Sequence, residues 1–166
     1  MTVTVSASKV LRASADQVFT AVTDLARQER WMVATRLYEL TAPAPSPQVG
    51  ARLAAFTGVA GVGFLDVMTV TEYDPPRRWV TAHEADFVRG VGIFEIDAAR
   101  DDSCRVTWTE HLDLPFGLVG RLGWPLVRPV ARVGLQVSLR RLAVQLRADA
   151  AAATTGTTAV TGGGRA

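Results

Sequence analysis

The spacing of apolar residues changes twice along the chain, and these changes constrain the fold more than any single motif. Residues 15–31 repeat at helical spacing, residues 35–109 alternate with a period of two, and residues 124–148 return to helical spacing. A period of two is typical of half-buried strands, and a period near 3.6 is typical of amphipathic helices. The sequence therefore predicts an α+β domain, with an antiparallel sheet and helices gathered on one face.

Turn signals divide the alternating region into separate strands. The expected strands cover residues 3–11, 33–41, 50–57, 63–73, 78–87, 90–98 and 103–114. Short turns join several of them, including Asp74-Pro-Pro-Arg77 and residues 88–89, so neighbouring strands should pair antiparallel. Ser14, with Gln17 three residues later, is a capping box that predicts a helix start, and a second short helix is expected over residues 25–31.

We expect one domain over residues 1–148 and a disordered tail over 149–166. The tail is rich in alanine, threonine and glycine, and it offers few large apolar residues to offset the entropy of ordering. Glycines in residues 117–123 predict a short broken helix before the long helix, which should begin near Trp124. Pro129 is expected to kink its start, and segment 115–124 could act as a gate.

The C-terminal helix is strongly basic, although the net charge of the whole chain is only +2. Residues 121–148 carry six arginines and no acidic residue, whereas residues 1–120 carry 11 basic and 15 acidic residues. Such a segment could attract a membrane surface, a nucleic acid or an acidic protein, and a solvated helix face is the simpler interpretation. We expect no specific nucleic-acid binding, and peripheral membrane contact remains open.

The composition argues against several classes of site. The single cysteine, Cys104, excludes an internal disulfide and a multi-cysteine zinc site, and only two histidines, His83 and His111, are present. No nucleotide-binding loop or catalytic-triad motif is found. No secretory signal and no run of 18 uncharged apolar residues is found either. We therefore expect no metal, no cofactor, no transmembrane segment and a cytoplasmic location.

Three segments resemble the START-like (SRPBCC) superfamily, which includes polyketide cyclases/dehydrases, lipid-transfer domains and birch-pollen-allergen-like proteins. They are residues 14–24 followed by Trp31, residues 70–79 with their Asp-Pro-Pro hairpin, and residues 104–108. The likeness spans about residues 3–148. It implies a helix-grip fold, in which a curved sheet grips the C-terminal helix and encloses an apolar cavity. The superfamily has no single catalytic signature, so the resemblance specifies the fold better than the chemistry.

Alternation within the strands predicts which side chains face that cavity. A turn at residues 88–89 would place His83 opposite Phe94, and the next hairpin would place Gly92 opposite Glu110. The small residues at 85, 90 and 92 should leave space above the sheet. The predicted ligand-binding residues are Phe64, Met68, Trp79, His83, Ala85, Gly90, Gly92, Phe94, Trp108, Glu110, Val130, Val133 and Val137.

Two inward ionisable groups are the candidates for catalysis. Glu110 is either a general acid or base, or the partner of a helix arginine such as Arg132 or Arg140. His83 either orients a ligand or is a hydrogen-bonded core residue. The predicted register separates their β-carbons by roughly 12 Å, which counts against a shared catalytic role.

The C-terminal helix carries two apolar stripes on opposite faces, and the sequence leaves open which one faces the cavity. One stripe is Leu126, Val130, Val133 and Val137; the other is Leu135, Leu139, Leu142 and Leu146. A stripe left exposed would need a partner, for which a homodimer is one answer.

These features favour a protein that binds a small apolar molecule, such as a lipid, a polyketide or an aromatic metabolite. A polyketide cyclase or dehydratase is one alternative, and it requires two ionisable groups near one reacting carbon. A regulatory or toxin-like interaction protein that uses the basic helix is the other.

Overall fold

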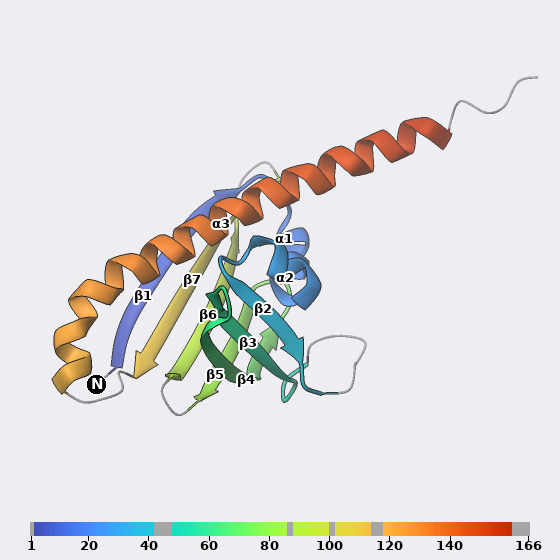
Figure 1. Ribbon diagram of the computed structural model, residues 1–166. Coiled ribbons are helices and arrows are strands. Elements are labelled where there is room, and N and C mark those ends of the chain that lie inside the picture. The colour runs from blue at the N-terminus through green and yellow to red at the C-terminus, as the bar shows by residue number, and fades with distance from the viewer. Residues whose placement is uncertain (1, 42–47, 86–87, 100–101, 114–117, 161–166) are drawn as a thin grey trace, which may run out of the picture.

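A computed structural model describes residues 2–41, 48–85, 88–99, 102–113 and 118–160. The elements in chain order are β1 (Thr2–Leu11), α1 (Ala15–Thr23), α2 (Leu25–Trp31), β2 (Thr35–Glu39), β3 (Arg52–Val59), β4 (Val62–Asp74), β5 (Arg78–Ala85), β6 (Val88–Ala98), β7 (Cys104–Asp113) and α3 (Leu118–Val160). The strands form one antiparallel sheet in the order β1-β7-β6-β5-β4-β3-β2. This confirms the predicted α+β helix-grip fold, with α3 across one side of the curved sheet (Figure 1).

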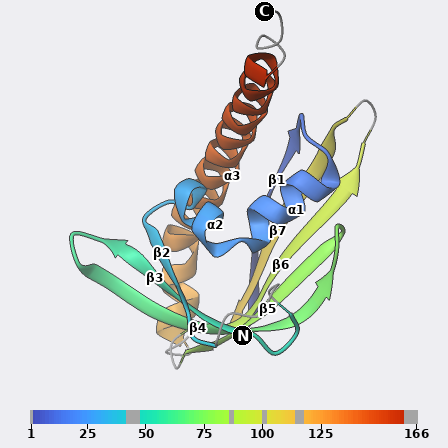
Figure 2. The same cartoon turned by 90° about the vertical axis from the view of Figure 1, so that its right-hand side faces the viewer.

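The helix pair α1–α2 begins and ends where the sequence predicts. The Ser14 side chain accepts a hydrogen bond from the Gln17 amide, and the Gln17 side chain accepts one from the Ser14 amide. Asp24 caps α2 by accepting from the Arg27 amide at 3.1 Å. These caps satisfy amides that the first turn of a helix leaves unpaired. Figure 2 shows both short helices lying between the two arms of the bent sheet.

Helix α3 is longer and more continuous than the sequence predicts. It runs without a break from Leu118 to Val160, with Pro125 and Pro129 inside it. The predicted break before Trp124 is therefore wrong. Residues 149–160, expected to belong to a disordered tail, continue α3; residues 115–117 and 161–166 lie outside the described part of the chain. The alanine-rich stretch has high helix propensity, and extending an existing helix avoids the cost of nucleation.

The leucine stripe of α3 packs inward, and the valine stripe does not. Leu135, Leu139, Leu142 and Leu146 are all buried in the core, and α3 contacts β1, α1 and α2. Val130 and Val133 lie on the opposite face and are 71% and 55% exposed, while Val137 is half-buried. Their predicted place on a cavity wall is corrected here, because one helix cannot turn both stripes toward the sheet.

The register of β5 on β6 also differs from the prediction. Val88 and Arg89 lie within β6 and not in a turn, so His83 pairs with Gly90, and Phe94 pairs with Trp79. The shift is by an even number of residues, which leaves every side chain on its predicted face. The strand β7 pairs as expected, with Gly92 opposite Glu110 and Phe94 opposite Trp108.

A β-bulge in β4 compensates for an error at the neighbouring hairpin. Asp74 pairs with Arg78, whereas the predicted turn places Tyr73 there. The register then shifts between Val70 and Glu72, so Met68 lies opposite His83, which is the pairing that a turn placing Tyr73 opposite Arg78 implies. A bulge adds one residue to one strand, and it therefore restores the pairing that the turn had displaced.

Candidate functional site

Three ionisable side chains from three strands meet on the inner face of the sheet. The Nδ1 atom of His83 lies 2.5 Å from Oδ2 of Asp66, and its Nε2 atom lies 2.9 Å from Oε2 of Glu110. The indole Nε1–H of Trp108 donates to the other Glu110 oxygen, Oε1, at 2.6 Å. The side chains of Asp66, His83 and Glu110 are 6%, 8% and 13% exposed, so this network is largely shielded from water. We call these three residues the acid–histidine cluster.

Two glycines allow the acid–histidine cluster to form across the intervening strand β6. Gly92 is opposite Glu110, and a β-carbon at Gly92 would lie 3.1 Å from both carboxylate oxygens of that residue. Gly90 is opposite His83, and its φ of +138° places a hypothetical β-carbon 1.9 Å from the carbonyl oxygen of His111. Gly90 is therefore required by the backbone, and Gly92 leaves room for the Glu110 carboxylate.

The cluster holds a proton on His83. Burial by itself would lower the pKa of His83, but the hydrogen bonds to Asp66 and Glu110, with the charges of both carboxylates, raise it to about 10. The imidazolium then donates both ring N–H groups, one to each carboxylate. A charged histidine between two carboxylates is a stable arrangement for buried charge, because each group has a partner.

This geometry corrects the predicted cavity over Gly92. The Glu110 carboxylate occupies the space that the glycine leaves open. Glu110 pairs with His83 and Trp108, and not with Arg132 or Arg140. The separation of His83 from Glu110 across β6 is also corrected, since the true register brings their side chains into contact.

Aromatic side chains fill the next part of the inner face. Trp79, Phe94 and Trp108 stack along the sheet, with ring centroids 5.8 and 4.8 Å apart. Trp31 of α2 packs edge-on against Phe94 and Trp108, and its indole N–H donates to the Ala21 carbonyl. These rings and Met68 belong to the buried core. Phe64 is 39% exposed near the end of the β3–β4 hairpin, and Ala85 is half-buried where β5 ends.

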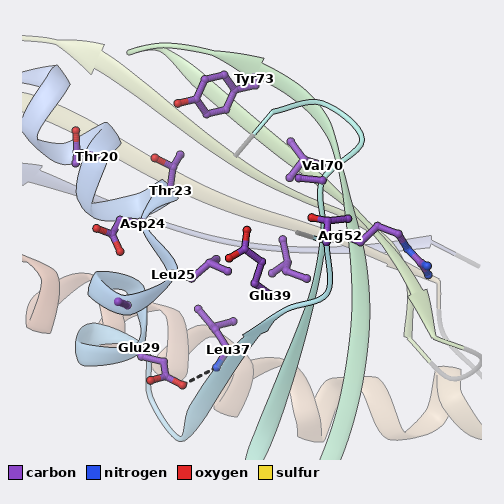
Figure 3. A pocket seen from close by; sticks show the side chains of 14 residues that line it. Thr20, Thr23, Asp24, Leu25, Glu29, Leu37, Glu39, Arg52, Val70 and Tyr73 are labelled. Atoms are coloured by element: carbon purple, nitrogen blue, oxygen red, sulfur yellow. Dashed lines mark hydrogen bonds between the residues drawn. The ribbon is translucent and has the colours of Figure 1, made fainter. Parts of the chain in front are cut away.

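A pocket of about 670 Å³ lies between the helix pair α1–α2 and strands β2, β3 and β4 (Figure 3). Its apolar wall combines residues from the helices and from the sheet, namely Leu25, Leu37, Leu53, Val70 and Tyr73. Thr20 and Thr23 of α1 also line it. None of the predicted ligand-binding residues lines this pocket. Its position depends on how α2 faces β2, which the alternation pattern of single strands does not contain.

Carboxylates dominate the charge of this pocket. Asp24, Glu29 and Glu39 line it together with Arg52. Figure 3 shows Glu39 directed toward Leu25, whereas Arg52 extends away from the carboxylates. The Arg52 guanidinium donates to Glu84 at 3.0 Å, and Glu29 accepts from the Leu37 amide at 2.7 Å. The Glu39 carboxylate makes no hydrogen bond or ion pair with any residue that the structure describes, so it is the pocket carboxylate best placed to meet a ligand.

Other site types find no support in the described residues. Among them, no group of three His, Cys, Asp or Glu side chains is arranged to hold a metal ion. Within the same part of the chain, no helix has the length and apolar character needed to cross a membrane. Cys104 is fully buried in the core, and burial raises the pKa of its thiol. His111 forms a hydrogen bond with the Thr4 hydroxyl at 2.9 Å.

A family model described as "Polyketide cyclase / dehydrase and lipid transport" matches residues 2–147. No curated protein matches the chain at a significant level.

Solved structures share the fold at low sequence identity. The Thermus thermophilus protein TTHA0849 superposes with a TM-score of 0.74 and 17% identity, covering 89% of this chain and 99% of that one. A START superfamily protein from Mycobacterium smegmatis superposes with a TM-score of 0.70 and 16% identity, covering 87% of this chain and 97% of that one. DynU16, a putative protein in the dynemicin biosynthetic locus, superposes with a TM-score of 0.62 and 18% identity. The match covers 87% of this chain and 47% of the DynU16 chain. These likenesses show the START-like fold.

Proposed function

Because the chain belongs to the polyketide cyclase/dehydrase and lipid transport family, we propose that it binds a small, largely apolar molecule such as a lipid, a polyketide or an aromatic metabolite. The pocket beneath α1–α2 carries this proposal. Its volume of about 670 Å³ falls within the range of roughly 300–1,000 Å³ that is typical of small-molecule sites. Half of its 14 lining residues are apolar or aromatic, and the other half are polar or charged, so it offers both an apolar surface and polar groups that can orient a ligand.

We place the ligand in this pocket and not over Gly92. The space above Gly92 holds the Glu110 carboxylate, and the aromatic rings beside it pack against Trp31. A ligand over Gly92 would have to displace a buried charged network, which is costly. A ligand beneath α1–α2 would meet side chains that already border an open space.

The charge of the pocket supports a neutral or cationic ligand. Asp24, Glu29 and Glu39 create a negative potential there, and the one arginine of the pocket, Arg52, is paired with Glu84. These carboxylates would repel a free carboxylate on the ligand, whereas a hydroxyl or an ammonium group could donate hydrogen bonds to them. Alcohols, polyols and amines with an apolar body therefore fit better than fatty acids.

Displacement of a neutral dye tests the location. Ala26 lies on the exposed side of α2 and lines the pocket, so Ala26→Trp should place an indole in the pocket and reduce its volume without disturbing the core. We expect this variant to lose Nile red binding by at least ~10-fold, because the indole takes up part of the volume that a drug-sized molecule needs. Ala148→Trp, on the exposed surface of α3, is the matched control and should bind like the parent.

Equal dye binding by Ala26→Trp and the parent would remove the pocket from the proposal. Native mass spectrometry of the purified chain identifies any molecule that co-purifies with it. A carboxylic acid found there would contradict the proposed ligand class.

Acid–base catalysis is the second candidate, favoured by the contact between His83 and Glu110. The 2.9 Å contact removes the distance argument against a cyclase or dehydratase, since general acids and bases act at hydrogen-bonding distance. A substrate would have to replace one of the hydrogen-bonding partners within the cluster. If the chain turns over a polyketide analogue, His83→Gln should lower the rate by ~100-fold or more. A rate unchanged in His83→Gln would exclude the cluster as the catalytic site.

A further inference from the structure

The first half of α3 exposes a continuous row of aliphatic side chains. Leu122, Leu126, Val130 and Val133 are 79%, 78%, 71% and 55% exposed. Their spacing places them along one face of the helix, opposite to the buried leucines. We call these four residues the outer stripe. An exposed aliphatic row of this length is unusual on a protein without a partner for it.

Unpaired arginines lie along the same helix as the outer stripe. Arg128, Arg132, Arg140, Arg141 and Arg147 are exposed, and none forms an ion pair with another residue in the described ranges. Residues 121–148 contain no acidic residue that could neutralise them. Arg140 and Arg141 project on either side of the line along which the outer stripe runs. Arg128 and Arg132 lie on the opposite face of the helix, so the positive charge beside the apolar row comes from Arg140, Arg141 and Arg147, which follow it along α3.

We propose that the outer stripe of α3 docks on an anionic lipid bilayer. A helix that presents aliphatic residues with flanking arginines lies in the membrane interface, with its apolar side chains at the boundary of headgroups and acyl chains. The arginines then contact lipid phosphates, and each basic residue near an anionic surface adds to the attraction. This inference rests on α3 alone and does not depend on the ligand proposed for the pocket.

The arginines beside the outer stripe disfavour a second copy of the chain or a nucleic acid as its partner. In a twofold dimer the same surface meets itself, and residues 121–148 supply no acidic side chain to pair with the arginines beside it. A nucleic acid would satisfy the arginines, but its phosphates and sugars offer nothing to four exposed aliphatic side chains. An anionic bilayer matches both the charge and the apolar row.

Vesicle flotation tests the proposal with the full chain. We expect the chain to float with vesicles of phosphatidylcholine and phosphatidylglycerol, and to remain in solution with vesicles of phosphatidylcholine alone. Leu126→Glu/Val130→Glu should abolish flotation. Arg140→Gln/Arg141→Gln should weaken binding by roughly 5-fold for each arginine removed, from the attraction of a basic residue to an anionic surface. Raising the ionic strength should weaken it further.

A matched variant on the outer surface of the sheet serves as the control. Val10 is 50% exposed on β1, and Val10→Glu should float like the parent. Circular dichroism checks that each variant keeps the parent's helix content, and all substituted side chains are exposed. A parent chain that ignores anionic vesicles, or that binds neutral vesicles equally well, would overturn the proposal. So would a dimer in light scattering that Leu126→Glu/Val130→Glu dissociates, because a second copy would then occupy the stripe.

Discussion

The imidazole of His83 reaches the carboxylate of Glu110 across an entire strand, with Nε2 and Oε2 2.9 Å apart. His83 lies on β5 and Glu110 on β7, and β6 between them contributes Gly90 and Gly92 at the positions beneath the contact. Because neither glycine has a side chain, two polar groups from non-adjacent strands can pair on the inner face. The same contact explains both the strongly basic histidine and the filled space over Gly92.

Removal of the histidine should destabilise the fold more than removal of the whole cluster. His83→Leu leaves two buried carboxylates without a shared cation, and breaking a buried ion pair in this way costs about 3–5 kcal/mol. Replacing Asp66, His83 and Glu110 together by leucine should recover most of that loss, since apolar residues carry no desolvation cost. Urea unfolding measures both variants. A triple variant that is less stable than His83→Leu would contradict the interpretation.

Stability should fall as the pH rises above neutrality. His83 has a pKa of about 10 in the folded protein and about 6.5 when unfolded. The stabilisation is therefore complete below pH ~6.5 and is lost as the pH rises toward ~10, because only the folded state retains the proton in this window. Each unit by which the folded-state pKa exceeds the unfolded-state pKa corresponds to about 1.4 kcal/mol in the free energy of unfolding.

Chemical denaturation between pH 6 and pH 10 measures this dependence, with His83→Gln as the control. The free energy of unfolding should change less between pH 6 and pH 10 in His83→Gln than in the parent chain. A parent chain whose free energy of unfolding is constant over this range would show that His83 is not held protonated by its neighbours.

The two glycines of β6 should differ in their sensitivity to alanine. At Gly90 the positive φ and the contact of 1.9 Å with the His111 carbonyl combine, so Gly90→Ala should cost more than the ~1–3 kcal/mol of a strained backbone alone. At Gly92 the new β-carbon meets only movable side-chain oxygens at 3.1 Å, and we expect a loss of about 1–3 kcal/mol. Gly134→Ala, where no atom lies within 4 Å, is the control and should be neutral or stabilising. Equal losses of stability in Gly90→Ala and Gly92→Ala would contradict this prediction.

The charge preference of the pocket should change with one residue. The parent chain should displace Nile red more readily with decanol than with decanoate, because Glu39 and its acidic neighbours repel a carboxylate. Glu39→Lys should narrow or reverse this preference by removing one negative charge and adding a positive one. Asp97→Lys makes the same charge change on the exposed surface of β6 and should leave the preference unchanged. An identical shift in both variants would mean that net charge, and not the pocket, selects the ligand.

The thiol of Cys104 should report global unfolding. Its side chain is fully buried, and burial raises the pKa of the thiol. The thiolate is the reactive form, so alkylation by iodoacetamide at pH 8 should be ~100-fold slower in the folded chain than in urea. Comparable rates would show that β7 opens readily at its start.

Local chemistry in the sequence was sufficient for the strands, the two short helices and the faces of the strands, although not for the extent of α3. The capping box at Ser14, the alternation along β7 and the turn at Asp-Pro-Pro each act through neighbouring residues, so their presence can be predicted without tertiary structure, although the register at that turn was one residue off. The pairing of Gly92 with Glu110 followed from the same alternation. The family resemblance rested on these segments too.

Only the tertiary structure decided which groups meet. Alternation assigns a side chain to one face of a sheet, but a shift of two or four residues keeps that face, so the contact of His83 with Glu110 could not be predicted. The two stripes of α3 are similarly apolar, and packing against β1 and α2 selected the leucines. The pocket arises where α2 faces β2, and its position depends on the bend of the whole sheet. Periodicity is a property of one segment, whereas contacts between segments depend on their relative placement in three dimensions.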